Sequence, residues 1–505
     1  MPTAVAVAIV DDQGLAAARE PWDGIVRERA DGTDRWAGET GPITGWTRTL
    51  EVEPLGGGLH RVTQRTDYEL DLPFFTWLFA YPARRELRRV PLRDKPPWWA
   101  PTEALDSMAA RAVCALCILS MASGYLGTLL TQTITFAGGE FGVGAGGQGV
   151  ALAVSRVDLV LAFSAVALAD RLGRRRVLAI AVLVAIGFTA AGALTPSLPL
   201  LIASQVPARG LTAAMNLVIG VHAAEEVPSH ARAWTASVLA LINALGAGVC
   251  VATLPAADLG LRGWRLSYVV PLAFLPLVLM AVRRLPESRR FMRSRAGADA
   301  AAPRLRGHGK RLGMLCGGGY LAAAFVNPAA QLQNTFLRDE RGFSALRITV
   351  FTLLTGTPAG IGVVAGGRLA ERSRRSVAAV GLVAGTILVV LAYMSAGWPL
   401  WALGIAAGIF SAATVPALAV YGPELFPTAV RGRANGFISV AARIGAVTGL
   451  LTAGLLSTRL GGLGPALAVL AVGPLLLALL VITVYPETAS RELEDLNPED
   501  REPPP

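Results

Sequence analysis

The sequence has few charged residues for its length. Of its 505 residues 16% are charged, 53% are hydrophobic, and the mean hydropathy is +0.49. A soluble domain carries about 25% charged residues, so this shortfall excludes an ordinary soluble protein. A helix crosses a bilayer with roughly 20 apolar residues. Twelve stretches meet this length: 108–133, 147–169, 176–194, 199–223, 234–256, 265–284, 311–336, 346–369, 377–395, 399–421, 433–455 and 464–484.

Cysteine is equally scarce, and all four residues fall inside predicted spans: Cys114, Cys117, Cys250 and Cys316. The pair Cys114-x-x-Cys117 has no second ligand pair, which argues against a metal site. We interpret the cysteines as small apolar packing residues. The motifs G-x-x-x-x-G-K-[ST] and H-E-x-x-H are absent, so neither nucleotide hydrolysis nor a metalloprotease is expected. We predict no enzyme, no metal and no cofactor.

The net charge of +10 does not indicate a nucleic-acid partner, because the basic residues are placed at alternate junctions between spans. They concentrate at 171–176, 283–311, 372–375 and 431–433. Such a bias marks the cytoplasmic side of a membrane protein. It predicts a multi-pass protein of the inner (plasma) membrane with both termini in the cytoplasm. No signal peptide is recognisable, so the first span is expected to direct insertion.

Several short motifs occur twice, about 200 residues apart. E-E-V-P-S-H-A-R at 225–232 matches E-L-F-P-T-A-V-R at 424–431, with an offset of 199. P-E-S-R at 286–289 matches P-E-T at 486–488, with an offset of 200. A membrane protein built of two repeated halves suggests a site between them that opens to each side in turn.

The first 100 residues differ from the rest and are polar. Weak alternation at 46–53 and 59–72, on either side of three glycines, predicts a β-hairpin. An amphipathic helix with aromatic residues and arginines follows, lying either on the membrane surface or against the hairpin. The predicted divisions are an N-terminal extension 1–100, a first bundle 101–284, a cytoplasmic linker 285–310, a second bundle 311–486 and a disordered tail 487–505.

D-R-L-G-R-R-R at 170–176 resembles the signature loop of the major facilitator superfamily. Y-G-P-E-L-F-P-T-A-V-R-G-R at 421–433, P-E-S-R and P-E-T are similar to motifs of its sugar-porter and metabolite:proton symporter branches. The resemblance covers roughly residues 105–495. We therefore expect an all-α membrane protein of twelve transmembrane helices in two pseudo-symmetric six-helix bundles, with a small cytoplasmic α+β extension.

The repeated loops are candidate gates. Asp170 can accept hydrogen bonds from Arg232 or from a helix N-terminus of the other half, and such bonds must break when the inside opens. The loop arginines can equally serve topology alone. The gating candidates are Asp170, Arg171, Gly173, Arg174, Glu225, Arg232, Glu371, Arg372, Glu424 and Arg431.

Charged residues inside spans cost at least ~2.5 kcal/mol each, so they usually face a cavity or a partner. Asp158 stands 12 residues before Asp170, about 18 Å along a helix and near the bilayer midplane. One hypothesis gives Asp158 a proton-coupling role and gives Arg156, Arg209 or Arg443 an anion-binding role. The alternative is a static ion pair between Asp158 and Arg156 or Arg209.

Polar uncharged residues follow one face of the first and seventh spans: Tyr125, Thr128, Gln132 and Thr135, then Tyr320, Asn327, Gln331 and Asn334. They line a central cavity or bond one helix to another, at ~0.6 kcal/mol per bond. The pathway candidates are Arg156, Asp158, Arg209, Asn216, Asn327, Gln331, Asn334 and Arg443.

These features predict a secondary active transporter in the lipid bilayer. Its substrate would be a small polar organic solute, either an organic acid or a sugar-like metabolite, with a proton as candidate coupling ion. It is expected to act as a monomer. The alternatives are a drug or metabolite efflux pump, and a membrane sensor that regulates the N-terminal extension without transporting.

Overall fold

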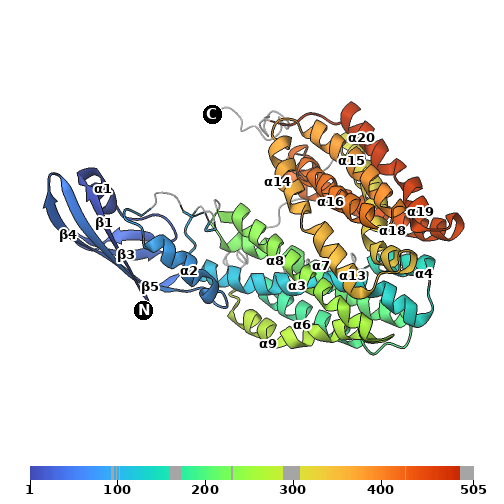
Figure 1. The fold of residues 1–505 in the computed structure, drawn as a ribbon, viewed down its shortest axis with the longest axis horizontal. Coiled ribbons are helices and arrows are strands. Elements are labelled where there is room, and N and C mark those ends of the chain that lie inside the picture. The colour runs from blue at the N-terminus through green and yellow to red at the C-terminus, as the bar shows by residue number, and fades with distance from the viewer. Residues whose placement is uncertain are drawn as a thin grey trace.

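The computed structural model describes residues 1–92, 96–97, 99–101, 103–157, 168, 172–228, 231–287, 308–426 and 428–489. A small sheet domain lies beside one end of a first helical bundle, and a second bundle follows (Figure 1).

The N-terminal extension is built on a five-stranded antiparallel sheet with the order β1-β5-β4-β3-β2. The strands are β1 (Thr3–Asp11), β2 (Arg27–Ala30), β3 (Arg35–Thr40), β4 (Ile43–Gly56) and β5 (Leu59–Leu70). The predicted hairpin is confirmed as β4 and β5, joined through Gly57 and Gly58 at φ +65° and +76°. Backbone in this left-handed region favours glycine. The other three strands were not predicted.

Two helices, α1 (Asp12–Ala18) and α2 (Thr76–Leu87), pack on one face of this sheet. A fully buried ion pair joins Arg48 Nη2 to Glu28 Oε2 at 2.7 Å under them. Trp46 Nε1 donates to the same carboxylate at 2.8 Å, and the Arg48 guanidinium lies 4.1 Å from the Trp36 ring centre. Buried charges are tolerated when they are paired and hydrogen-bonded in this way.

The helices of the first half are α3 (Ser107–Phe141), α4 (Ala145–Val154), η1 (Ser155–Val157), α6 (Arg174–Gly192), α7 (Leu198–Glu226), α8 (Arg232–Thr253), η3 (Leu254–Leu259), η4 (Gly263–Arg265) and α9 (Leu266–Arg284). Those of the second half are α11 (Gly309–Gln331), α12 (Gln333–Thr335), the π-helix η5 (Phe336–Glu340), α13 (Ala345–Gly356), α14 (Ala359–Ala370), α15 (Arg374–Met394), α16 (Trp398–Ala419), α17 (Tyr421–Glu424), α18 (Thr428–Leu460), α19 (Leu463–Leu470) and α20 (Val472–Thr483).

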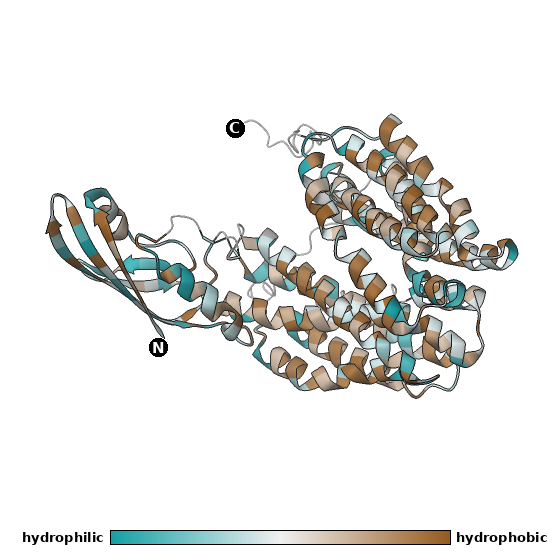
Figure 2. Ribbon diagram, viewed as in Figure 1, coloured by the Kyte–Doolittle hydropathy of each residue, from teal (hydrophilic) through white to brown (hydrophobic). Residues whose placement is uncertain are grey.

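Ten helical segments among the described residues are long and apolar enough to cross a membrane, and they coincide with ten of the predicted spans. The predicted fourth span is α7, of 29 residues, which is not among the ten. The predicted second span is described only up to Val157 and at Leu168. Hydrophobic residues run along the helices of both bundles, whereas the sheet is mixed (Figure 2). The predicted fold class, a helical membrane protein with a small α+β extension, is confirmed.

Among the described residues, the buried core is continuous between the halves at one end only. One cluster combines first-half residues such as Leu129 and Ile134 with second-half residues such as Leu332 and Leu450. The clusters around Leu116 and around Phe426 each belong to a single half. We call the end where α3 and α11 finish the sealed end, and the end where α6 and α15 begin the open end. The two bundles meet near α4 and α13 and diverge away from there (Figure 1).

The 200-residue repeat also reappears in the packing at the sealed end. The Glu140 carboxylate accepts hydrogen bonds from Trp264 Nε1 at 2.8 Å and Arg265 Nη2 at 2.9 Å. Glu340, 200 positions later, accepts one from the backbone amide of Leu463 at 2.7 Å. Each half therefore fastens the end of its first helix to the start of its last.

Candidate functional site

Polar contacts between the halves line the sealed end. Asn334 Nδ2 donates to Gln132 at 2.9 Å (backbone O) and 2.8 Å (Oε1). Thr335 Oγ1 donates to Gln148 Oε1 at 2.6 Å. Since these residues lie in opposite halves, any opening at this end must break these bonds.

A carboxylate adds a contact that the sequence analysis missed. Asp258 Oδ1 and Oδ2 accept from the backbone amides of Ala345 at 2.8 Å and Leu346 at 2.9 Å, at the start of α13. A negative charge at a helix N-terminus satisfies amides that have no partner within the helix and interacts favourably with the helix dipole. Asp258 thus fastens the first half to the second.

Three predicted pathway residues come together between the halves. Arg156 Nη2, from η1, donates to Asn327 Oδ1 of α11 at 2.8 Å. Gln331 Nε2, one turn along α11, donates to the same oxygen at 3.1 Å. The Gln331 side chain is buried, and its Oε1 has no hydrogen-bond partner among the described residues. This cluster combines a cation, two amides and an unused acceptor.

The remaining pathway candidates are placed separately. Asn216 Oδ1 accepts from Ser123 Oγ at 2.8 Å and from Asn243 Nδ2 at 3.1 Å, all within the first half. Arg209 Nη1 donates to the Gly127 carbonyl at 3.1 Å, also within the first half. Arg443 is half-buried on α18. Asp158 lies outside the described residues, as do its proposed ion pairs.

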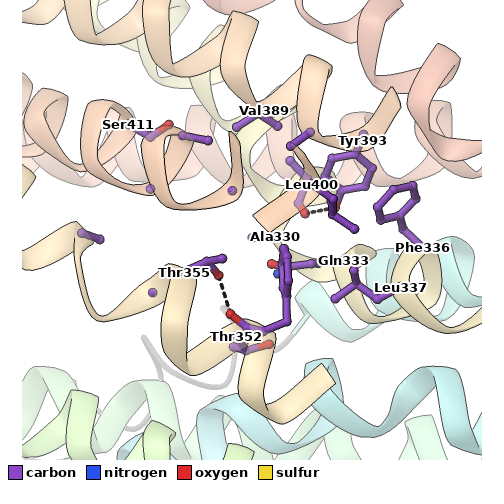
Figure 3. A pocket seen from close by; sticks show the side chains of 18 of the residues that line it. Ala330, Gln333, Phe336, Leu337, Thr352, Thr355, Val389, Tyr393, Leu400 and Ser411 are labelled. Atoms are coloured by element: carbon purple, nitrogen blue, oxygen red, sulfur yellow. Dashed lines mark hydrogen bonds between the residues drawn. The ribbon is translucent and has the colours of Figure 1, made fainter. Parts of the chain in front are cut away.

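A cavity of about 300 Å³ lies inside the second half, between α11, α12, η5, α13, α14, α15 and α16 (Figure 3). Most of its lining is apolar, and its polar groups include Gln333, Thr352 and Ser411. Thr352 Oγ1 is buried and has no hydrogen-bond partner among the described residues. The sequence analysis did not find this cavity, because its walls come from seven separate helical segments of ordinary, mostly apolar composition.

The first copy of the repeated loop forms a compact charged unit at the open end. Arg174 Nη2 lies 3.1 Å from Glu225 Oε1. Glu287 Oε1 accepts from the backbone amides of Arg174 at 2.9 Å and Arg175 at 3.3 Å, at the start of α6. Gly173 has φ +98°, and a Cβ there would stand 2.6 Å from Glu287 Oε2. Glycine therefore lets the carboxylate reach the helix start.

The second copy repeats this unit. Arg374 forms an ion pair with Glu424. Glu487 accepts from the backbone amides of Arg374 at 3.1 Å and Arg375 at 3.3 Å, and from Ser373 Oγ at 2.8 Å. Burial raises the pKa of the Glu487 carboxyl, but the hydrogen bonds from Ser373 and the backbone amides outweigh it, so the pKa lies below its ordinary value.

The structure thus brings together Gly173, Arg174 and Glu225 in the first copy and places Glu424 in the second. Three further gating candidates are exposed: Arg232, Glu371 and Arg372. Three lie where the structure gives no side-chain description: Asp170, Arg171 and Arg431. The hydrogen bond that Asp170 is predicted to accept from Arg232 or from a helix N-terminus of the other half therefore falls outside the described residues.

Sequence reasoning gave no role to three residues of these units: Glu287, Arg374 and Glu487. The repeat itself held the signal, since Arg174 and Arg374, like Glu287 and Glu487, are 200 positions apart. In the described part of the chain, no group of three or more metal-ligating side chains forms a metal site.

Comparison with known proteins gives a family match and a fold match. Residues 312–504 match the family model of the Major Facilitator Superfamily. The structure is similar to the xylose transporter XylE from E. coli in its inward open conformation, with 17% identity, a TM-score of 0.62, and coverage of 77% of this chain and 98% of that one.

Two further solved structures are similar. The nucleoside transporter NupG gives 13% identity, a TM-score of 0.61, and coverage of 74% of this chain and 100% of that one. A bacterial homolog of the human lysosomal transporter Spinster, in an inward-facing conformation, gives 15% identity, a TM-score of 0.61, and coverage of 79% of this chain and 99% of that one. At these identities the likeness shows the fold alone. No curated protein matches the sequence.

Proposed function

Since the second half of this chain belongs to the Major Facilitator Superfamily and the helical region as a whole has that fold, we propose that the protein moves a small polar organic solute across the membrane by alternating access. The resemblance predicted from the sequence is confirmed. The family match and the transporter neighbours indicate secondary transport rather than catalysis. We further propose the class of its substrate, its coupling to protons and its orientation in the membrane.

Alternating access is supported by the way the halves meet. Among the described residues they share one buried core and several hydrogen bonds at the sealed end, and separate cores at the open end. Rocking one half against the other would exchange these two arrangements. Arginine placement supports a cytoplasmic open end, and with it cytoplasmic termini in an inner or plasma membrane.

The single observation that carries the substrate class is the contact of Arg156, Asn327 and Gln331 across the halves. A guanidinium binds carboxylates and hydroxyls through several donors, and amides both donate and accept. Gln331 is buried, and its Oε1 has no hydrogen-bond partner among the described residues, so a solute that donates to this oxygen is favoured. An organic acid or a sugar-like metabolite meets that requirement, and the neighbours named above include transporters of xylose and of nucleosides.

Purified full-length protein in liposomes tests this proposal. We expect saturable counterflow for at least one member of a panel of organic acids, sugars and nucleosides. Gln331→Ala should reduce that flux about 10-fold or more, because the variant loses a buried polar contact with the solute. Gln333→Ala is the matched control, since Gln333 lines the apolar cavity instead. Binding of the panel without flux would favour the sensor alternative.

Efflux of amphipathic compounds is the second candidate function, and the apolar cavity of about 300 Å³ in the second half favours it. An apolar site with few polar groups is typical of small-molecule binding. In that case Gln333→Ala and Thr352→Ala should impair flux, and Gln331→Ala should leave it unchanged. The two candidates therefore predict opposite patterns for one pair of variants.

Proton coupling is assigned to Asp158 on the sequence alone. A coupling acid must bind and release a proton in each transport cycle. Asp158→Asn should abolish accumulation driven by a pH gradient and spare exchange at equal concentrations. Continued accumulation in this variant would mean that Asp158 is not the coupling site.

A further inference from the structure

The N-terminal extension is fastened to the first bundle at its open end. Ser107 Oγ, in the first turn of α3, donates to the Ile43 carbonyl at 2.8 Å. Arg111 Nε donates to Asp71 Oδ2 at 2.6 Å. The Phe74 ring lies 5.3 Å from the Arg284 guanidinium at the end of α9. The junction is thus a defined interface between extension and bundle.

This interface encloses a cavity of about 150 Å³. One wall comes from the extension and the following segment, including Phe75, Leu78, Phe79 and Trp99. The opposite wall comes from the first turns of α3 and α8, including Val113 and Val238. Almost every lining residue is apolar, so the cavity suits a hydrocarbon chain and offers a polar ligand few partners.

Helix α2 contributes Leu78 and Phe79 to this cavity, and its separate, exposed face has the pattern of a membrane-surface helix. Trp77 and Tyr81 are 76% and 74% exposed, and they are one turn apart. Arg84 and Arg88 continue the same face at helical spacing and are also exposed. Aromatic residues favour the bilayer interface, and arginines pair with anionic headgroups.

We propose that this cavity binds a segment of an acyl chain of an anionic phospholipid from the leaflet at the open end, with the headgroup of that lipid held by Arg84 and Arg88. The cavity is lined by the first turns of α3 and α8, which are both candidate membrane spans, so the proposed lipid tail would enter it from the bilayer around these helices. The charge of the α2 face matches an anionic headgroup. The bound lipid would fill the joint between extension and bundle and would hold them in one orientation.

Photo-crosslinking of the full-length, delipidated protein tests the proposal. Phosphatidylglycerol and phosphatidylcholine, each with a diazirine in one acyl chain, are compared, and the crosslinked peptides are mapped by mass spectrometry. We expect phosphatidylglycerol to label residues 105–117 and 234–242, and phosphatidylcholine to label them roughly 5- to 30-fold less. Arg84→Ala combined with Arg88→Ala should reduce phosphatidylglycerol labelling to the phosphatidylcholine level. Arg29→Ala, an exposed arginine on β2, should not.

Filling the cavity provides the second arm. Val238→Phe should reduce labelling about 10-fold, because the added ring takes up the volume that the chain needs. Leu241→Phe is the matched control on the same helix, at a residue 69% exposed. Ala110→Leu fills the cavity from α3 instead, and it provides an independent test if Val238→Phe fails to fold. Labelling spread evenly over all lipid-facing helices, or unchanged in both filling variants, would overturn the proposal, as would equal labelling by the two lipids.

Discussion

Thr135 and Thr335 stand 200 positions apart in the sequence, and their Oγ1 atoms lie 2.8 Å apart. The Thr335 hydroxyl donates its one hydrogen bond to Gln148 Oε1, so in the bond between the two threonines Thr135 is the donor. Two equivalent residues of a two-fold repeat can touch only where the repeat axis passes between them. The sealed end is therefore closed on the axis that relates the halves, and rocking about the central site must separate this pair.

Thr135→Val removes the hydroxyl and keeps the shape of the side chain. A buried hydrogen bond of this kind contributes about 0.5–1.5 kcal/mol, so the population sealed at this end should fall roughly 2- to 10-fold relative to the alternative state. Spin labels at the exposed residues Leu194 and Trp398, in opposite halves, should report longer distances by electron resonance. Thr458→Val is the control, because that hydroxyl bonds within its own helix to Leu455. An unchanged distance distribution would mean that the hydrogen bond between the two threonines does not influence the conformational equilibrium.

Gly173 and Ser373 occupy equivalent places before α6 and α15, and the two should respond differently to alanine. Gly173→Ala places a Cβ at φ +98° and 2.6 Å from Glu287 Oε2, which costs on the order of 1–3 kcal/mol. Ser373 has φ −157°, which alanine adopts freely, so Ser373→Ala introduces no backbone strain. It loses the hydrogen bonds of the Ser373 hydroxyl to Glu487 and to the amide and hydroxyl of Ser376 at the start of α15, about 0.5–2 kcal/mol in all. Thermal unfolding in detergent measures both variants. An unchanged unfolding temperature in Gly173→Ala would contradict the requirement for glycine in the first copy.

Glu487 should make stability depend on acid. Its pKa is depressed in the folded state, so its contribution is fully present above the unfolded value of about 4.3 and is lost as pH falls through the lower folded value. Glu487→Gln should therefore unfold at a lower temperature than the parent near neutral pH, and the difference should shrink below about pH 4.3. Glu371→Gln, at an exposed glutamate of the same end, should show no such convergence. A difference that is constant with pH would mean that the charge of Glu487 is not what stabilises the start of α15.

Much of the helical region was predictable, because a membrane imposes a fixed length of apolar residues on every span. The repeat offset was equally visible, and Arg374 was reachable from Arg174 by adding 200. The contact between Arg156 and Asn327 was not, because it depends on how two helices from different halves are rotated against each other. The two cavities escaped prediction for the same reason, since their walls are assembled from residues far apart in sequence.

The N-terminal extension shows a different limit of prediction from sequence. Its β4–β5 hairpin was predicted from three adjacent glycines and weak alternation, which report local geometry. Strand β2 has only four residues, and its Glu28 reads as an ordinary surface charge. Only the fold shows that Glu28 is buried against Arg48, a residue of β4. A long-range ion pair leaves no local pattern in the sequence.

That ion pair yields the last prediction. Glu28→Gln leaves the Arg48 guanidinium buried without its counter-charge, which typically costs about 3–5 kcal/mol. A domain of this size has little more stability than that, so the extension should unfold and become sensitive to limited proteolysis within the full-length protein. The double variant Glu28→Met with Arg48→Met replaces the pair by apolar side chains of similar length and should restore protection, because apolar substitutes are often neutral. If the extension is an accessory to transport, all three proteins should show the same counterflow in liposomes while differing in proteolysis. Loss of counterflow in Glu28→Gln, with recovery in the double variant, would instead show that the folded extension takes part in the transport cycle.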